Sequence, residues 1–496
     1  MIFGLLGWVV FWVLFAVFVF LGFFGAKWRK GDLSQLGEWA LAGRKLGVFL
    51  VWFLVGADLY TAYTFVAVPS LEYAVGAEGF YAVPYVAITF AVAMLFMTIL
   101  WDKSREKGYI TAADFVHDTF RSPTLAILIA LTGIVAELPY IALQIDGMRA
   151  VLSVMFFNYT AVKTVSEWAL VISFIILAAF VYTSGLRGAT LGAVFKDVLI
   201  WISIVALIVI VPLKYGGFAT AFADAQKAHA FSTGLQTLKP AMASAFTSLF
   251  IGSALALYLY PHAVNGSLSA ESRKSLRLST ALLPIYGIGL AILALMGILV
   301  YADPAALSMT KVLSGLAAIP ALAVTAFPQW FAAIILLGVF VGGLVPAAIM
   351  AIAQANLLTR NIIKPMMPKI TPKGETQISK WASVAFKFIA LSFVFLTPLT
   401  YAIQLQLTGG IIILETLPAV FLGLLTSKLD KYSMIVGWFV GMISSIYLLL
   451  YVNHFKTLSI STYPILGHPI YIGLIGLSIN LLIVFIGTLI KLSVKK

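Results

Sequence analysis

The chain has no cysteine and very few charged residues for its length of 496 residues. The absence of cysteine excludes disulfide bonds and thiol catalysis, and it leaves the redox compartment open. Charged residues make up 10% of the chain and hydrophobic residues 62%, and the mean hydropathy is +1.04. A soluble domain of this length with such a composition would aggregate. The composition therefore predicts an all-α polytopic membrane protein, which we expect in the cell (plasma) membrane.

Apolar segments long enough to cross roughly 30 Å of hydrocarbon recur along the chain, and we count about 13 of them. They run over residues 2–25, 47–75, 79–101, 123–156, 162–184, 189–213, 240–262, 277–302, 326–358, 381–403, 408–427, 432–453 and 469–491. The first lacks a preceding basic segment and is too long for the apolar part of a signal peptide, so we interpret it as a true span. An odd number of spans places the two termini on opposite sides.

Lysine and arginine are distributed unequally between the loops. They gather at residues 27–45, 103–121, 187, 273–277, 360–380, 428–431 and 495–496, whereas the opposite loops hold isolated lysines. Because cytoplasmic loops carry the excess of basic residues, the pattern predicts an external N-terminus and a cytoplasmic C-terminus. We therefore attribute the formal net charge of +13 to membrane orientation and expect no nucleic-acid partner.

Segment 47–75 is interrupted near its middle by Gly56, Ala57 and Asp58. A carboxylate at mid-depth costs at least ~2.5 kcal/mol, so we expect Asp58 to face a protein interior or a water-filled cavity. Unwound backbone at membrane depth is tolerated only beside a cavity or inside protein, and such breaks hold substrate and ions in secondary transporters. We predict a broken helix here; the alternative is a packed helix with a structural aspartate.

Two polar segments, 214–239 and 303–325, follow spans at corresponding places and indicate an internal duplication. Each unit would have five spans, and because five is odd the two units would be inverted. We predict a single transporter domain with a first repeat over 47–213 and a second over 240–427.

The second repeat should contain its own broken helix. Segment 240–262 is the candidate, because Gly252 is flanked by Ser248 and Ser253 and the segment reaches Pro261 near its end.

Segment 123–156 carries several polar residues. Glu137 lies near its centre, and Gln144 lies seven residues later on the same helical face. No basic residue is within helical reach of Glu137, so we expect this carboxyl group to be unpaired and protonated. Asp146 lies on the opposite face, and we expect it to pair with Arg149.

Three more charged positions leave alternatives open or have a simple explanation. Asp197 is next to Lys196 near a span end, and it is either a solvated end charge or a group in cation exit. Glu415 has either a structural hydrogen bond or a function. Lys387 is expected to extend its ammonium group to the membrane surface.

Five motifs lie in an order and spacing that point to one family. They are GEWALAGRKLG at 37–47, GADLYTAYTFVAVP at 56–69, YITAADFVHDTF at 109–120, LYLYPH at 257–262 and GLVPAAIMAIAQANLLTRNII at 343–363. In these motifs the chain resembles the sodium:solute symporter family, and most of all its bacterial monocarboxylate (lactate/pyruvate) permease branch. The resemblance implies a LeuT-like core of ten helices in two inverted five-helix repeats, with extra helices at the ends.

The resemblance also implies a cation site. The family's sodium site uses an alanine, here Ala57, and the carbonyl of the third residue after it, here Tyr60. It is completed by a carbonyl at the position of Gly342 and by two adjacent hydroxyls, where this chain has Val345 and Pro346. Na⁺ prefers several oxygen ligands, so the loss of two weakens the site and puts sodium coupling in question. We expect no metal centre and no cofactor.

A monocarboxylate needs hydrogen-bond donors, which the freed N–H groups of a broken helix supply. The candidate substrate-binding residues are Tyr60, Thr61, Tyr63, Gln144, Ser248 and Ser253. The candidates for ion coupling are Asp58, Glu137 and Ala57. For each tyrosine the alternative is ordinary packing.

We therefore predict uptake of a short-chain monocarboxylate coupled to protons, with Asp58 as the first candidate carrier. A sodium-coupled symporter of the same fold with another substrate is the alternative, and a channel or sensor is a weaker one. An enzyme is not expected, because none of the five histidines lies at a span centre and no paired metal-ligand spacing occurs.

Overall fold

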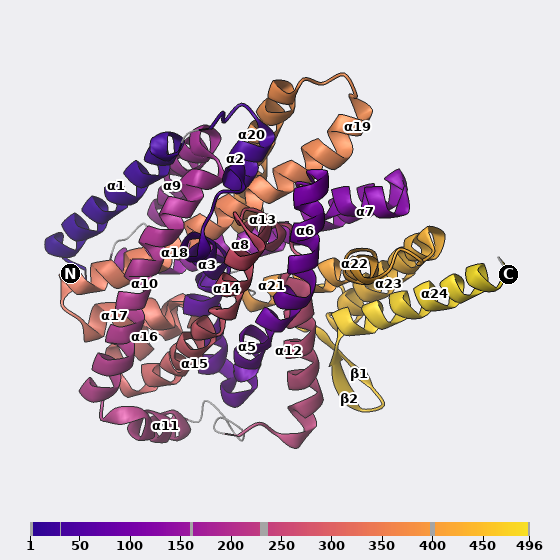
Figure 1. Ribbon diagram of the computed structural model, residues 1–496. Coiled ribbons are helices and arrows are strands. Elements are labelled where there is room, and N and C mark those ends of the chain that lie inside the picture. The colour runs from indigo at the N-terminus through magenta and orange to yellow at the C-terminus, as the bar shows by residue number, and fades with distance from the viewer. Residues whose placement is uncertain (1–2, 30, 159–161, 229–236, 397–401, 495–496) are drawn as a thin grey trace.

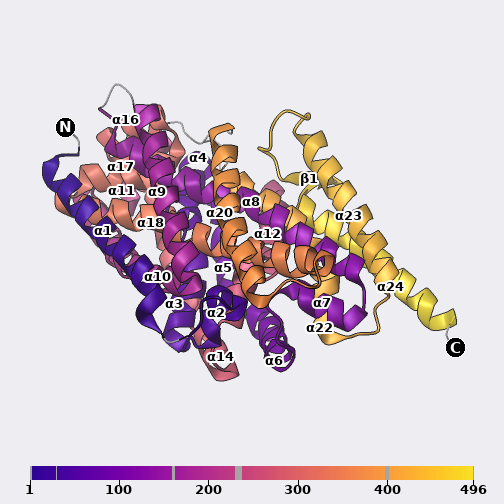
Figure 2. The same ribbon diagram turned by 90° about the horizontal axis from the view of Figure 1, so that it is seen from above.

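The computed structural model describes residues 3–29, 31–158, 162–228, 237–396 and 402–494, and Figures 1 and 2 show a bundle of long helices. The helices of the first part are α1 (Leu5–Trp28), α2 (Leu36–Leu41), α3 (Val48–Leu59), η2 (Tyr63–Ala67), α4 (Val68–Val75), α5 (Ala82–Val92), η4 (Ala93–Met97), α6 (Thr98–Lys107), α7 (Ala112–Phe120), α8 (Pro123–Met155), α9 (Val162–Ser184), α10 (Leu186–Lys214) and α11 (Gly217–Lys227).

The second part continues the bundle. Its helices are α12 (Ala243–Leu257), α13 (Pro261–Leu268), α14 (Arg273–Ala281), α15 (Pro284–Leu299), α16 (Pro304–Leu313), α17 (Ala318–Ala326), α18 (Gln329–Leu357), η8 (Leu358–Ile363), α19 (Lys364–Met366), α20 (Pro372–Leu396), α21 (Ala402–Leu414), η10 (Pro418–Leu422), α22 (Gly423–Leu425), α23 (Lys431–Val452) and α24 (Ile472–Val494).

Each predicted apolar segment falls mainly on helical structure, although residues 397–401 of segment 381–403 lie outside the described residues and segment 469–491 begins in strand β2. Within the described ranges, 11 helices are long and apolar enough to cross a membrane by themselves, and a pair bent by 47°, Ile403–Leu414 with Pro418–Leu425, raises the number to 12. The predicted segment 47–75 is divided between α3, η2 and α4, and α3 by itself is too short to be counted. The division follows from a break in the helix, described below.

α18 is the centre of the bundle. Its most apolar stretch is 94% buried, and it packs against α1, α8, α10 and α20. Small residues permit this crowding. A Cβ atom at Gly343 would come within 2.7 Å of the Gln144 carbonyl oxygen on α8, and one at Gly147 of α8 would come within 2.3 Å of Ala62 Cβ. α8 therefore lies in close contact with α18 on one side and with the divided helix on the other.

A short hairpin covers one end of α12. Strands β1 (Thr462–Ile465) and β2 (His468–Tyr471) pair antiparallel with Ile465 opposite His468, and Figure 1 places them next to α23 and α24. The turn between them uses Gly467 at φ 83°, a left-handed conformation that glycine adopts without strain. The Tyr471 ring lies on Gly252 of α12, where a Cβ atom would come within 2.4 Å of it.

The structure decides among the alternatives for the isolated charges. Glu415 accepts hydrogen bonds from Ser445 at 3.1 Å and from Asn480 at 2.9 Å, so it joins α21, α23 and α24 in a structural role. The expectation for Lys387 is wrong: its side chain is fully buried and donates to the Ser383 carbonyl and hydroxyl on its own helix.

The expected pair of Asp146 with Arg149 is also wrong. The guanidinium of Arg149 lies 3.9 Å from the Glu167 carboxylate on α9. Neither carboxylate oxygen of Asp146 has a hydrogen-bond partner in the described part of the chain. Arg149 turns toward α9, which packs against α8.

The predicted orientation can be tested with single cysteines, because the chain has none of its own. We expect a cysteine at Leu466, at the exposed tip of the hairpin, to react with a membrane-impermeant thiol reagent in intact cells. A cysteine at the exposed Lys373 should react only after permeabilisation. The opposite labelling pattern would show that the chain is inserted in the opposite orientation.

Candidate functional site

The broken helix exists, but its break lies at Tyr60 and Thr61 and not at Gly56–Asp58, which remain helical in α3. α3 ends at Leu59, and Tyr60 has φ −94° and ψ 80°, outside the helical region. Helical structure resumes with η2, a π-helical segment, which is a type of distortion often found at functional sites. Asp58, Tyr60, Thr61 and Tyr63 are at most 2% exposed. The break is therefore sealed from solvent in this conformation.

The backbone N–H groups that the break leaves without helical partners, at the start of η2, find other partners. Ala62 donates to Gln144 Oε1 on α8 at 3.1 Å, and Tyr63 donates to Thr61 Oγ1 at 3.0 Å. Buried backbone donors require such partners. The amide nitrogen of Gln144 has no partner among the described residues. Gln144 therefore caps the second half of the broken helix and keeps two N–H donors available.

The free carbonyl oxygens at the end of α3 are met by a lysine. Lys196 Nζ on α10 donates to the Tyr60 carbonyl at 2.7 Å and lies 3.4 Å from the Ala57 carbonyl. The C-terminal end of a helix carries partial negative charge and favours a cation. The two halves of the broken helix are thus held by different neighbours, α10 at the carbonyl end and α8 at the N–H end.

The sequence left open whether Asp197 is a solvated end charge, and the structure excludes this. Lys196 and Asp197 form an ion pair of 2.8 Å in which both side chains are fully buried. The Tyr286 hydroxyl on α15 donates to the second oxygen of Asp197 at 2.6 Å. Sequence reasoning placed this pair at the surface because it lies close to a predicted span end, but α10 begins at Leu186 and carries both residues into the interior.

Tyr286 also explains the glycine at position 56, in the last turn of α3. A Cβ atom at Gly56 would lie 2.2 Å from the Tyr286 hydroxyl oxygen. The Tyr60 ring packs against Tyr286 in a T-shaped contact of 4.4 Å and against Trp201 at 5.4 Å. Tyr60 therefore has a packing role in this conformation, whereas its carbonyl belongs to the site.

Asp58 lies one residue after Ala57 and is 2% exposed. Neither carboxylate oxygen has a hydrogen-bond partner in the residues that the structure describes. Glu137, His262 and Lys196 are close enough to act on Asp58 electrostatically. Asp58 is therefore a buried carboxyl group without a hydrogen-bond partner, as are the hydroxyls of Tyr60 and Tyr63 at the same break.

The expectation that Glu137 is unpaired is wrong. His262 Nδ1 lies 2.8 Å from Glu137 Oε1, and the His262 backbone N–H donates to the same oxygen at 3.0 Å. Both side chains are fully buried. Glu137 thus binds the start of α13, 125 residues further along the chain. The motif LYLYPH was the only sequence signal for this contact, and helical spacing within one segment could not reveal it.

The second broken helix exists, but its break is not at Gly252. α12 runs without interruption to Leu257, and α13 begins at Pro261, where the missing proline N–H suits the first turn. α13 packs against α3, so the second broken helix lies beside the first. The break is at Tyr258–Tyr260 because proline starts a new helix there.

The two predicted serines of α12 have different surroundings. Ser248 accepts a hydrogen bond from the Tyr471 backbone N–H at 2.9 Å and donates to the Ala245 carbonyl at 3.1 Å, so it fastens the hairpin. The Ser253 hydroxyl is buried without a hydrogen-bond partner in the described ranges. The structure therefore assigns Ser248 a structural contact and leaves Ser253 with an unused donor.

Val345 and Pro346 are fully buried in α18 next to α10. A Cβ atom at Gly192 would lie 3.3 Å from Val345, and one at Gly342 would lie 3.7 Å from Ile200. Gly192 and Ile200 lie four residues before and after Lys196, on the same face of α10. Lys196 thus lies on the face that packs against this part of α18. No cluster of three or more His, Asp or Glu that could hold a metal occurs in the described ranges.

One face of α8 extends from the site toward a cavity of about 430 Å³. Ala126 lines this cavity, and Ile129 and Gly133 line a smaller one of about 20 Å³. Glu137 and Gln144 follow along the same face. The larger cavity is the candidate entrance on the side predicted to be cytoplasmic.

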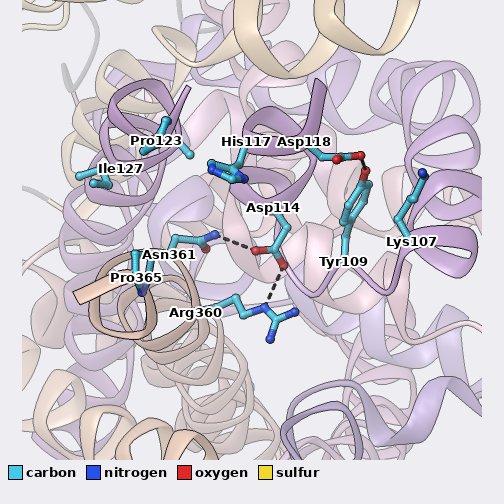
Figure 3. Close-up of a pocket in the computed structure, with 11 residues that line it drawn as sticks. Lys107, Tyr109, Asp114, His117, Asp118, Pro123, Ile127, Arg360, Asn361 and Pro365 are labelled. Atoms are coloured by element: carbon cyan, nitrogen blue, oxygen red, sulfur yellow. Dashed lines mark hydrogen bonds and ion pairs between the residues drawn. The ribbon is translucent and has the colours of Figure 1, made fainter. Parts of the chain in front are cut away.

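Figure 3 shows how α7 and η8 meet at the larger cavity. Asp114 of α7 accepts from the Asn361 amide at 2.8 Å and pairs with Arg360 at 3.6 Å. Thr111 donates to Asn361 at 2.8 Å. Thr111 also lines the smaller cavity, whereas Asn361 lines the larger one. This group of contacts lies between the two cavities.

The contact of Gly56 with Tyr286 gives a direct test of the break. We expect Gly56→Ala to displace Tyr286 from Asp197 and to destabilise the protein by about 1–3 kcal/mol, as overpacked cores do. Thermal unfolding of the purified protein measures this. Gly287→Ala is the matched control, because its Cβ would meet nothing nearer than 3.7 Å. Equal unfolding temperatures for the two variants would contradict the proposed packing.

Comparison with known proteins agrees with this architecture. A relative described as a monocarboxylate transport permease protein, from Rhizobium johnstonii (strain DSM 114642 / LMG 32736 / 3841), is 38% identical over 477 residues and covers 95% of this chain and 94% of its own. An uncharacterized symporter of Bacillus subtilis (strain 168), YodF, is 29% identical over 472 residues, with 94% of this chain and 90% of its own covered.

A similar fold is found among solved structures. The outward-open, substrate-bound structure of a Na⁺-coupled sialic acid symporter superimposes with a TM-score of 0.76 at 14% identity and covers 98% of both chains. At this identity the likeness shows the fold, which is LeuT-like. The sequence model of the sodium:solute symporter family matches residues 39–443. The chain is therefore a multi-pass membrane transporter that belongs to the sodium:solute symporter family.

Proposed function

We propose that the protein imports short-chain monocarboxylates together with protons, without any chemical step. The observation that carries this proposal is the group of buried polar side chains at the two breaks that have no hydrogen-bond partner in the described residues. They are the Asp58 carboxyl group, the Gln144 amide nitrogen and the hydroxyls of Tyr60, Tyr63, Ser253 and Tyr258. Buried polar groups are normally satisfied, so an unsatisfied group in a transporter is a candidate for substrate binding.

The donors in this group favour a small acid. The Gln144 amide, Ser253 and Tyr258 together provide N–H and O–H groups, and a carboxylate accepts through two oxygens. The fully buried surroundings leave room for a compact substrate only after the site opens. The relative that is 38% identical is described as a monocarboxylate permease, which supports the same substrate class.

Proton coupling is supported by the position of Asp58. Glu137 already has a partner in His262, whereas Asp58 has free oxygens beside the break. A protonated Asp58 would accompany the substrate anion inward, and the step would be nearly electroneutral. This avoids moving net charge through roughly 30 Å of hydrocarbon.

We expect proteoliposomes with the wild-type protein to accumulate labelled lactate or pyruvate when the inside is more alkaline. A gradient of one pH unit supports up to about tenfold accumulation for one proton per substrate, because 1.4 kcal/mol corresponds to a factor of ten. An imposed sodium gradient should add nothing. Uptake driven by sodium alone would overturn proton coupling, and a lack of saturable counterflow would indicate a channel.

The role of Asp58 is tested by Asp58→Asn. We expect this variant to exchange bound substrate across the membrane and to lose accumulation driven by pH, because it cannot release a proton. Asp146→Asn is the matched control, since Asp146 is equally buried and also lacks a hydrogen-bond partner in the described part of the chain. Accumulation that persists in Asp58→Asn, at the level of Asp146→Asn, would show that another group carries the proton.

The role of Gln144 is tested by Gln144→Glu and Gln144→Ala. The glutamate keeps an oxygen for the Ala62 N–H but replaces the free amide donor by a second oxygen. We expect at least about tenfold weaker apparent affinity for the acid, because one charge-assisted hydrogen bond is lost and the new carboxyl group disfavours the substrate anion. The alanine should lose both stability and affinity. Unchanged affinity in Gln144→Glu would make Gln144 a helix cap only.

A further inference from the structure

The end of α3 forms a cation site made of oxygen atoms. Its ligands are the carbonyl oxygens of Ala57 and Tyr60 and the carboxylate of Asp197, which come from the broken helix and from α10. Freed carbonyls at the C-terminal end of a half-helix coordinate cations in secondary transporters. Here the Lys196 ammonium lies within 3.4 Å of all three residues.

The ammonium group of Lys196 contacts all three residues that form the site. It has three N–H donors and no acceptor, and three oxygen atoms surround it. Lys196 is fully buried, so these contacts replace its hydration. The neighbouring part of α18 offers Val345 and Gly342 against Gly192 and Ile200, which are side chains without oxygen. These side chains offer a second cation no oxygen ligand, and the ammonium charge would repel it.

We propose that Lys196 is a tethered cation that occupies this site permanently, so that sodium does not bind there. Its ammonium group holds the carbonyl end of the broken helix against α10. This inference goes beyond the proposed function, because it stands whatever acid is transported. It makes Lys196 a positioning residue whose charge, rather than its bulk, keeps the break in its closed geometry.

A comparison with Lys387 shows that burial of a lysine does not by itself place its ammonium group at the break. Lys387 is the other fully buried lysine in the described residues, and within them its ammonium binds only Ser383 on its own helix. Lys196 instead connects α10 to α3. The chain thus provides a matched control, since both residues are buried ammonium groups and only one bridges the break.

The first test needs no substrate. Thermal unfolding of the purified wild-type protein is measured in sodium chloride and in choline chloride at equal ionic strength. A bound ion in large excess over its Kd would raise the unfolding temperature. We expect the same temperature in both salts, and a rise specific to sodium would overturn the inference. Because this measurement does not depend on transport, its result can be interpreted even if the assigned substrate is wrong.

The second test restores the cation from solution. We expect Lys196→Ala to transport labelled pyruvate by counterflow at least about tenfold more slowly than wild type, because removing one member of a buried ion pair leaves the other uncompensated. Lys387→Ala should keep most of its rate. Ethylammonium, which is close in size to the missing side-chain end, should raise the rate of Lys196→Ala several-fold over choline at equal ionic strength.

A merely structural role would not respond to the choice of cation. Equal rates of Lys196→Ala in ethylammonium, sodium and choline would therefore overturn the inference, as would an equal loss in Lys387→Ala. If Lys196→Ala does not fold, Lys196→Ala with Asp197→Asn takes its place, because it removes both charges together and keeps the two carbonyl oxygens. The transport rates of this double variant in ethylammonium, sodium and choline are then compared in the same way.

Discussion

The fold depends on how a helix can be interrupted inside a membrane. Backbone N–H and C=O groups that lose their helical partners must find others, because no water is present in the hydrocarbon to replace them. In this protein Gln144 receives the N–H of Ala62, and Lys196 binds the carbonyl of Tyr60. Each cap comes from a different long helix, so the positions of α8 and α10 relative to α3 are fixed by the break itself.

This constraint also explains the distribution of small residues. Gly343 and Gly147 bring α18 and the broken helix into contact with α8, and Gly56 accepts the ring of Tyr286. Larger residues at these positions would move the caps away from the groups they satisfy. Dense packing of this kind resists small displacements and favours a change between discrete arrangements. The contacts of Asp114 and Asn361 hold α7 against η8 between the two cavities.

The buried charges divide into groups with different partners. Glu137 with His262 is a pair in which two helices distant in sequence meet, whereas Lys196 and Asp197 are neighbours on α10. Glu415 and Lys387 bind neutral polar groups and support local structure. Asp58 has free oxygens beside the break, which is why the proposed proton carrier is placed there.

The sequence by itself determined the membrane class, the positions of the apolar segments and the break near Asp58, because hydropathy and helix propensity are local properties. Family motifs supplied the fold and directed attention to Val345 and Pro346. Only the tertiary structure decided that His262 meets Glu137, that Arg149 turns to Glu167 and that Lys196 lies at the break instead of the surface. The reason is physical: helical spacing reveals neighbours within about two turns, whereas these partners lie on different helices and meet only when the bundle packs.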